Sequence, residues 1–186
     1  MFTHALQERC PHLPLEEEGR LNDAKLRENF IERIFVRNRW RHFLSQSANR
    51  GRLVEFHTAH KLLLWSHNEA GMRRMGRLLG DAKKGKDQAL LEAYAEELHA
   101  TMWHRTTIKR HVNVLQHAAG YLKKILDPRD KAEVATAIED YRRGWLPLIV
   151  PITLLRFLIA KHDVEYLRGQ LYFEPHPKEL LLRIHV

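Results

Sequence analysis

Apolar residues recur along most of the chain at the three-to-four-residue spacing of amphipathic helices, and no segment shows a convincing two-residue strand period. The clearest stripe lies in residues 109–126 and consists of Val112, Leu115, Ala118, Ala119, Leu122 and Leu126. Comparable stripes predict helices over residues 52–68, 87–103 and 128–143. The pattern therefore predicts an all-α fold, a single bundle-like domain of about seven or eight helices.

Two further segments carry more specific expectations. A helix that begins after Asn22 or Asp23 is predicted to bury a stripe of Leu26, Phe30, Ile34 and Phe35, continued by Trp40, Phe43 and Leu44. The almost wholly apolar segment 147–162 predicts the central buried helix of the domain. Its prolines and Arg156 interrupt it too often for a bilayer span, so we expect no membrane association.

The ends of the chain break the helical pattern. Residues 1–21 contain two prolines and a run of three glutamates, which predicts an irregular appendage. Residues 22–50 predict a linking helix and a polar loop, and residues 51–186 the helical domain. The sequence LYFEPHP at 171–177 predicts a Pro-rich C-terminal turn, because a residue that precedes proline avoids the helical region.

The polar face of the helix predicted at 109–124 has no carboxylate. It carries Lys109, Asn113, Gln116, His117, Gly120 and Lys124. Such a face offers positive charge, amides and an imidazole, which suits an anion whose edges can be read by hydrogen bonds. The alternative interpretation is a basic face that only contacts solvent, or polar side chains that bond neighbouring helices.

Composition adds weight to the binding interpretation. The chain has 31 Lys and Arg against 23 Asp and Glu, a formal net charge of +8, which favours a polyanionic partner. Its single cysteine, Cys10, excludes an intrachain disulfide or a cysteine-ligated cluster from this chain alone, and fits a reducing, cytoplasmic setting. The sequence leaves the oligomeric state open.

Motifs for catalysis are missing from the sequence. It contains no GxSxG elbow, no phosphate-binding glycine loop and no HExxH, so we expect no catalytic residue, metal or cofactor. The chain has 13 histidines, and His57 and His60 lie three residues apart on one predicted helix. A histidine-based enzyme or metal site that uses His57, His60 or His117 is therefore an alternative.

Nucleic acid is a polyanion that these residue types suit. Basic side chains would neutralise phosphates, amides and imidazoles would contact bases or sugar hydroxyls, and Tyr121 or Trp103 could stack on an unpaired base, as in many RNA-binding proteins. Two positions from the preceding helix, His57 and Lys61, are expected to border the same surface. The predicted nucleic-acid-binding residues are Arg105, Lys109, Arg110, Asn113, Gln116, His117, Tyr121, Lys123, Lys124, His57 and Lys61.

Four segments resemble the YbgA-like family of bacterial helical domains of unknown function: LVEFHTAHKLLLWSHN (53–68), HVNVLQHAAGYLKK (111–124), PLIVPITLL (147–155) and YLRGQLYFEPHP (166–177). The resemblance covers roughly residues 50–184. Such domains occur behind iron–sulfur thiouracil or 4-thiouridine desulfidase domains. Residues 13–35 resemble the junction of these fusions, so residues 1–21 are expected to be the tail of a missing desulfidase domain.

The resemblance implies an accessory function. It implies that the helical domain binds RNA, specifically tRNA, for removal of sulfur from 4-thiouridine, and is not catalytic by itself because the cluster cysteines are absent. A second interpretation is a protein-interaction module that docks on a separate desulfidase domain.

Overall fold

The structure, a computed structural model, describes residues 9–10, 12–81 and 87–184. This part of the chain contains eight α-helices, two short 3-10 helices and no strand, which confirms the predicted all-α fold. None of its helices is both long and apolar enough to cross a bilayer. The helices are η1 (Glu18–Asn22), α2 (Ala24–Ser45), α3 (Arg50–His67), α4 (Glu69–Asp81), α5 (Asp87–Trp103), α6 (Ile108–Leu122), α7 (Pro128–Arg142), α8 (Ile149–Lys161), α9 (Glu165–Arg168) and η2 (Lys178–Leu180).

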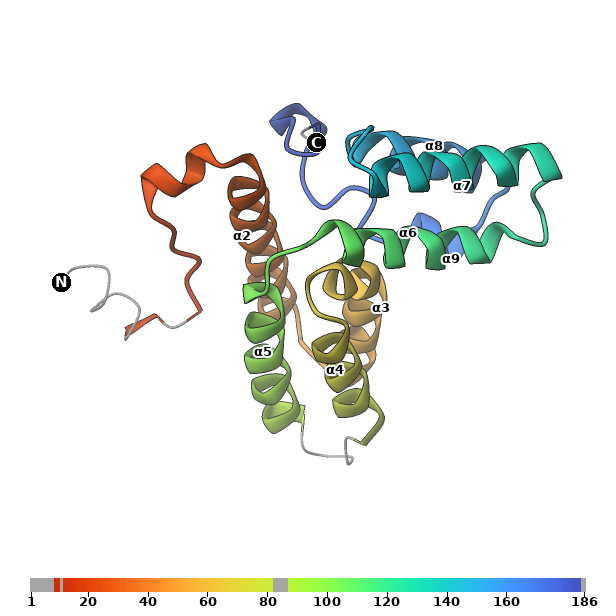
Figure 1. The fold of residues 1–186 in the computed structure, drawn as a ribbon. Coiled ribbons are helices and arrows are strands. Elements are labelled where there is room, and N and C mark those ends of the chain that lie inside the picture. The colour runs from red at the N-terminus through yellow and green to blue at the C-terminus, as the bar shows by residue number, and fades with distance from the viewer. Residues whose placement is uncertain (1–8, 11, 82–86, 185–186) are drawn as a thin grey trace.

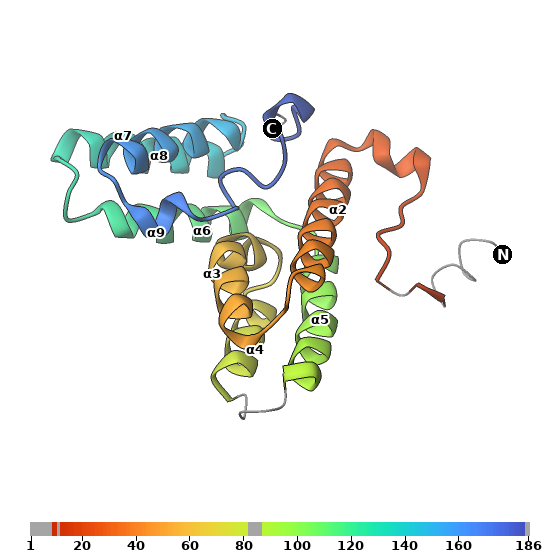
Figure 2. The same cartoon turned by 180° about the vertical axis from the view of Figure 1, so that it is seen from behind.

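The helices form two groups that meet at α6. Helices α2 to α5 run side by side, and α6 lies across one end of them (Figure 1). Helices α7 and α8 lie on the other side of α6, as the reverse view also shows (Figure 2). Helix α6 therefore contacts α3 on one side and α7 and α8 on the other. Its remaining face determines what the junction presents to solvent.

Side-chain caps start several of the helices, the first of them at Asp23, one of the two positions that the sequence predicts. Asp23 accepts hydrogen bonds from the amides of Lys25 and Leu26 at 2.8 and 3.0 Å. Thr107 caps α6, and Asp127 caps α7 directly before Pro128. Each cap satisfies an amide that has no partner within its helix, which is worth about 1 kcal/mol. These starts are set by local chemistry.

Helix α3 is the centre of the core. Its residues Leu53, Leu62, Leu63 and Leu64 have no exposed surface. Gln170, just after α9, bonds two backbone groups of α3 that are i, i+4 partners in a regular helix. Its amide nitrogen donates to the carbonyl of Thr58 at 2.7 Å, and its oxygen accepts from the amide of Leu62 at 3.1 Å. The C-terminal third of the chain is thus bonded directly to the central helix.

Gly71 marks the closest approach of α4 and α5. A Cβ atom at this position would lie 2.1 Å from the hydroxyl of Thr101, which is fully buried. Gly71→Ala is therefore expected to lower the free energy of unfolding by about 1–3 kcal/mol, as overpacked substitutions do. Gly80→Ala on the same helix meets nothing within 4 Å and should be neutral or slightly stabilising. Urea unfolding of both variants measures the difference, and equal stabilities would contradict the packing.

Residues 12–23, which precede α2, lie outside the helical core (Figure 1). Helix η1 buries no residue, and His12 stacks on His99 of α5 with ring centroids 4.1 Å apart. Helix α2, which we expected as a linking helix, packs Val36, Trp40 and Phe43 into the same core as the other helices.

The predicted buried stripe of α2 is confirmed at Trp40 and Phe43, but it is wrong at Leu44 and in the first half of the helix. There Leu26 and Phe30 are half-buried and Ile34 is 38% exposed, whereas Glu28, Asn29 and Glu32 are buried. The first half of α2 therefore turns polar side chains inward. The reason is a cation that reaches them from the other end of the chain, Arg183, which bonds both carboxylates. Hydrophobic spacing carries no information about such a distant partner.

The prediction that 147–162 forms the central helix is also wrong. Helix α8 buries Ile152, Leu155 and Ile159, but Phe157 on the opposite side is 61% exposed. Pro151 lies in the first turn, where a proline is tolerated, and does not break the helix. Helix α8 packs on α7 and α6 at the periphery, and α3 occupies the centre instead.

Candidate nucleic-acid interface

The exposed face of α6 is a continuous polar strip. Its members are all exposed and come from the carboxylate-free side of the helix, except for Lys124 in the turn just beyond its end. We call them the α6 strip: Lys109, Asn113, Gln116, Gly120 and Lys124. The opposite face of α6 packs into the core through Val112, Leu115, Ala118 and Leu122. Because burial of that face fixes the rotation of the helix, the amides and lysines must point outward.

The structure excludes one of the alternatives for the amides, that they are buried and bond neighbouring helices. Asn113 and Gln116 are exposed beside lysines, so they are available to a ligand rather than buried between helices. Lys123, at the C-terminal cap of α6, and Arg105, before its start, are exposed as well. Arg110 donates to the backbone carbonyl of Arg105 at 2.6 Å, which holds the basic N-terminal end of α6 together.

Aromatic side chains border the strip on the side of α3 and α9. His117 packs edge-on against Trp65 of α3, with ring centroids 4.6 Å apart, and against Tyr121 at 5.3 Å. Tyr121, which is 43% exposed, stacks on Tyr166 of α9 at 4.9 Å. We call Trp65, His117, Tyr121 and Tyr166 the aromatic border. Trp65 and Tyr166 were not predicted, since they lie on other helices and carry no motif.

Charge and burial keep the imidazole of His117 neutral. Partial burial lowers its pKa, and the positive charge of Lys61 lowers it further. Its Nε2 atom is buried and has no hydrogen-bond partner among the described residues. Lys61 of α3 thus lies close enough to His117 for its charge to act on the ring. A neutral ring is suited to stacking and hydrogen bonding rather than to pairing with a phosphate.

His57 does not reach this surface. Its Nδ1 atom is 3.1 Å from the hydroxyl of Tyr94 on α5, and the ring packs over Gly76 of α4. Burial lowers its pKa to about 4. The prediction that His57 borders the strip is therefore wrong, because its ring is buried between α3, α4 and α5.

His60 is similarly buried. Its ring stacks on Phe56 at 3.9 Å, and burial lowers its pKa to about 3. The two histidines considered for a catalytic or metal site thus have separate partners, Tyr94 for His57 and Phe56 for His60.

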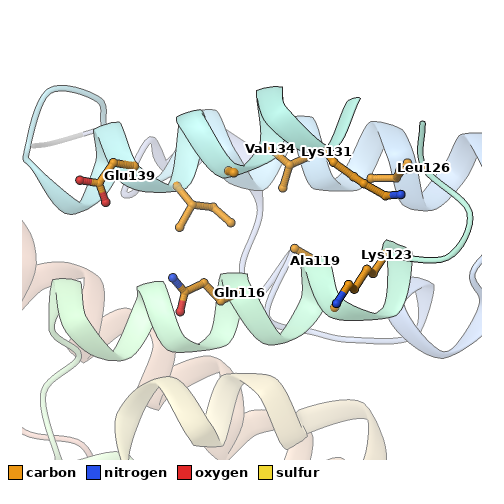
Figure 3. A pocket seen from close by; sticks show the side chains of 10 residues that line it. Gln116, Ala119, Lys123, Leu126, Lys131, Val134 and Glu139 are labelled. Atoms are coloured by element: carbon orange, nitrogen blue, oxygen red, sulfur yellow. The ribbon is translucent and has the colours of Figure 1, made fainter. Parts of the chain in front are cut away.

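A groove separates α6 from α7 on the other side of the strip. It has a volume of about 380 Å³. Its floor is apolar, with Ala119, Leu126, Val134 and Ile138. Figure 3 shows Gln116 and Lys123 of α6 facing Lys131 and Val134 of α7 across it. Gly120 has nothing within 4 Å of where a Cβ atom would lie, so the strip opens into the groove there.

The acidic side chain at the end of the groove already has partners. Glu139 accepts hydrogen bonds from Arg142 and Arg143 at 2.6 and 2.7 Å. These bonds lower its pKa to about 2. Glu139 therefore contributes little net negative charge to the groove, and the two lysines dominate its rim.

A second polar centre lies inside the protein, where α2 meets the C-terminal segment. Arg183 is buried and donates to Glu28 at 3.0 Å, to Glu32 at 2.7 Å and to the carbonyl of Tyr172 at 2.6 Å. The other oxygen of Glu32 lies 3.0 Å from Nε2 of His67. We call these five residues the Arg183 network. It joins α2, α3 and the C-terminal segment.

The two carboxyls of the network differ in protonation. Burial, reinforced by the charge of Glu32, raises the pKa of Glu28 to about 8. Burial alone would also raise the pKa of Glu32, but the His67 hydrogen bond and Arg183 outweigh it and hold that pKa below its usual range. One guanidinium thus neutralises one carboxylate, and Glu28 keeps its proton at neutral pH.

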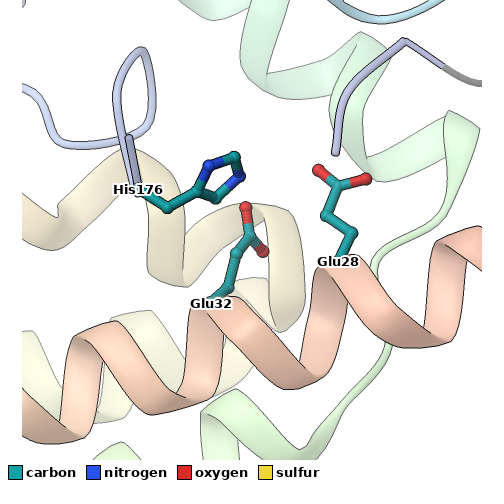
Figure 4. Close-up of side chains that lie close together, drawn as sticks. All are labelled: Glu28, Glu32 and His176. Atoms are coloured by element: carbon teal, nitrogen blue, oxygen red, sulfur yellow. The ribbon is translucent and has the colours of Figure 1, made fainter. Parts of the chain in front are cut away.

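The same region contains a possible set of metal ligands. One oxygen each from Glu28 and Glu32 and a nitrogen of His176 lie within 4.8 Å of one another. Figure 4 shows the imidazole of His176 reaching toward the two carboxylates, which project from α2. However, Arg183 pairs with both carboxylates and places a positive charge beside them. We therefore assign the cluster to the ion-pair network.

Comparison with known proteins gives a family without a function. A family model described as a protein of unknown function (DUF1722) matches residues 61–177, more than half of the chain. The uncharacterized protein YbgA of Escherichia coli (strain K12) is 26% identical over 164 residues, which are 88% of this chain and 97% of the relative. No solved structure matches the chain. The α6 strip lies inside the family match, whereas Glu28, Glu32 and Arg183 lie outside it.

Proposed function

The chain belongs to the family described as a protein of unknown function, DUF1722, and we propose that it binds RNA through the α6 strip. The observation that carries the proposal is the exposure of Lys109, Asn113 and Gln116 together on a helix without a carboxylate, with Lys124 exposed in the turn that follows it. The strip follows the length of α6, about 22 Å at 1.5 Å per residue, which is room for several nucleotides.

Each part of the surface has a distinct chemical task. The lysines of the strip, with Lys123 and Arg105, neutralise phosphates, and the released counterions add affinity. The amides of Asn113 and Gln116 contact base edges or ribose hydroxyls. Tyr121, already stacked on Tyr166, offers its exposed face to an unpaired base. The surface thus suits RNA with unpaired nucleotides better than a regular duplex.

We further propose that the RNA is tRNA and that the chain positions it rather than reacting with it. This part of the proposal rests on the likeness of its motifs to domains that accompany 4-thiouridine desulfidases. The chain has one cysteine, which cannot hold a cluster alone, so the sulfur chemistry belongs to a separate desulfidase domain or protein. A cytoplasmic location follows from such a substrate.

The proposal predicts a charge-dependent loss of tRNA binding. Lys109→Glu combined with Lys124→Glu is expected to lower the affinity at least about tenfold at low salt. The plot of log affinity against log salt should become shallower by about 1.4–1.8, because each lost phosphate contact removes about 0.7–0.9 from the slope. Fluorescence anisotropy with labelled tRNA from 50 to about 300 mM salt measures both values.

A matched control separates the strip from general electrostatics. Arg73→Glu combined with Arg77→Glu changes the net charge equally, on the exposed face of α4. It should weaken binding far less than the α6 pair. Equal losses in the two variants would refute the strip as the binding surface, and affinity that does not depend on salt would refute the proposed function.

A further inference from the structure

A pocket of about 430 Å³ lies at the N-terminal end of α6, apart from the groove between α6 and α7. Its walls come from the start of α2, the start of α6, the end of α7 and the link that precedes α8. The volume falls within the range of about 300–1,000 Å³ that is usual for small-molecule sites. The residues that line it are Lys25, Glu28, Thr106, Thr107, Ile108, Lys109, His111, Tyr141, Gly144, Leu146 and Leu148.

Three of the lining side chains are titratable although they are more than nine-tenths buried. Glu28, His111 and Tyr141 are 5%, 4% and 7% exposed. Contacts with neighbouring side chains fix their positions. Arg183 donates a hydrogen bond to Glu28 at 3.0 Å, and the hydroxyl of the buried Tyr172 lies 3.0 Å from Nδ1 of His111. The rings of His111 and Tyr141 pack edge to face, with centroids 6.3 Å apart. The inner wall is therefore a fixed set of polar groups.

The inner wall suits a planar heterocycle. With its pKa raised by burial, Glu28 is a carboxylic acid at neutral pH, and such a group both donates and accepts hydrogen bonds. A nucleobase edge presents donors and acceptors side by side. Ile108, Leu146 and Leu148 line the rest of the pocket with apolar surface that can contact the faces of a ring.

The mouth of the pocket carries positive charge. Lys25 from α2 and Lys109 from α6 both line the pocket and are exposed to solvent. Two ammonium groups beside a polar interior fit a ligand with an anionic group at one end and a hydrogen-bonding ring at the other. Lys109 is also the first residue of the α6 strip, so a strand that follows the strip would pass this mouth.

We propose that this pocket binds one nucleoside monophosphate unit, with its base against Glu28, His111 and Tyr141 and its phosphate between Lys25 and Lys109. The unit is either a free nucleotide or one nucleotide turned out of a bound RNA strand. The site shares Lys109 with the α6 strip, but its inner wall of Glu28, His111 and Tyr141 is not part of the strip. Binding of a free nucleotide does not require the proposed RNA-binding function.

Calorimetric titration of the full chain with AMP, GMP, CMP and UMP tests the proposal. At least one should bind, and ribose 5-phosphate and the matching nucleoside should each bind at least about tenfold more weakly, since each lacks one half of the contacts. Lys25→Glu should lower the affinity for the nucleotide at least about tenfold, because it removes a charge-assisted hydrogen bond and adds a charge that repels the phosphate. Lys131→Glu in the α6–α7 groove makes the same charge change elsewhere and should have no effect.

A second variant blocks the pocket without touching the α6 strip. Thr106→Trp fills the pocket and leaves the helix cap at Thr107 intact, and circular dichroism checks that the variant folds. Loss of mononucleotide binding supports a free-nucleotide site. Absent mononucleotide binding with a weakened tRNA affinity in Thr106→Trp supports a nucleotide within a strand.

Two outcomes would overturn the proposal that this pocket binds a nucleotide. The first is that folded Thr106→Trp binds both mononucleotides and tRNA as the parent chain does. The second is that mononucleotide binding depends on Lys131 and not on Lys25. If mononucleotides bind at Lys25 while tRNA does not bind at all, this proposal stands and the RNA-binding function fails.

Discussion

Replacing Arg183 by methionine is expected to lower the free energy of unfolding by about 3–5 kcal/mol. The substitution keeps much of the side-chain volume, but it leaves the buried carboxylate of Glu32 without its cation and the protonated carboxyl of Glu28 without its donor. It also removes the donor to the carbonyl of Tyr172. Since small domains have about 5–15 kcal/mol of stability in total, this variant should unfold at much lower urea concentration. Tryptophan fluorescence during urea unfolding measures the change.

Two comparisons show whether the loss comes from the buried charges. Arg168→Met removes an exposed arginine that pairs with Asp163, and it should cost less than about 1 kcal/mol. Adding Glu28→Gln and Glu32→Gln to Arg183→Met should recover part of the stability, because the buried charge of Glu32 is then gone and both side chains are neutral amides. A loss below about 1 kcal/mol for Arg183→Met would show that the network does not hold the C-terminal segment on α2.

The second large effect is a fall in the free energy of unfolding of the parent chain as the pH rises toward 9. We expect Glu28→Gln to abolish this fall. The pKa of Glu28 is about 8 in the folded protein, and the unfolded value is the ordinary one near 4.5. Below the lower value both states hold the proton and the full stability is present. Between the two values unfolding releases the proton, so stability falls by up to about 1.4 kcal/mol per pH unit. The stability contributed by the protonated Glu28 carboxyl is lost once the pH exceeds its pKa in the folded protein.

Glutamine resembles the protonated carboxyl and cannot ionise. Glu28→Gln should therefore be similar to the parent chain at pH 5 and more stable at pH 9 by about 2–4 kcal/mol. Urea unfolding at pH 5, 7 and 9 measures this difference. Glu139→Gln is the control, because the lowered pKa of Glu139 makes its contribution constant above about pH 5. The same pH dependence in Glu28→Gln and the parent chain would show that Glu28 ionises normally.

Several other titratable groups lie near Glu28 and could also contribute to the pH dependence of stability. Glu32 lies one turn further along α2 and Arg183 comes from the C-terminal segment. His111 and Tyr141 face it across the pocket, and Lys25 stands at the pocket mouth. The charge of Glu28 in turn raises the pKa of Tyr141, after the larger effect of burial. The difference between the parent chain and Glu28→Gln isolates the carboxyl from these neighbours.

The sequence alone determined the helices and the exposed face of α6. Side chains at i, i+3 and i+4 share one side of a helix, so the spacing from Val112 to Leu122 predicts which side is buried and leaves Asn113 and Lys124 outside. The starts of α6 and α7 were predictable too, since Thr107 and Asp127 cap amides within three residues. Both signals depend only on near neighbours in the chain.

The tertiary structure alone decided which polar residues are inside and where the cavities lie. Glu28 and Glu32 are buried because Arg183 meets them from more than 150 residues away, and no local pattern records that pairing. His57 turns to Tyr94 instead of the α6 surface for the same reason, a contact between separate helices. The pocket at the N-terminal end of α6 forms only when several helices pack together. Lys25 of α2 and Tyr141 of α7, for example, both line it. Helical periodicity gives the buried side of a helix, but the packed neighbour determines what that side touches.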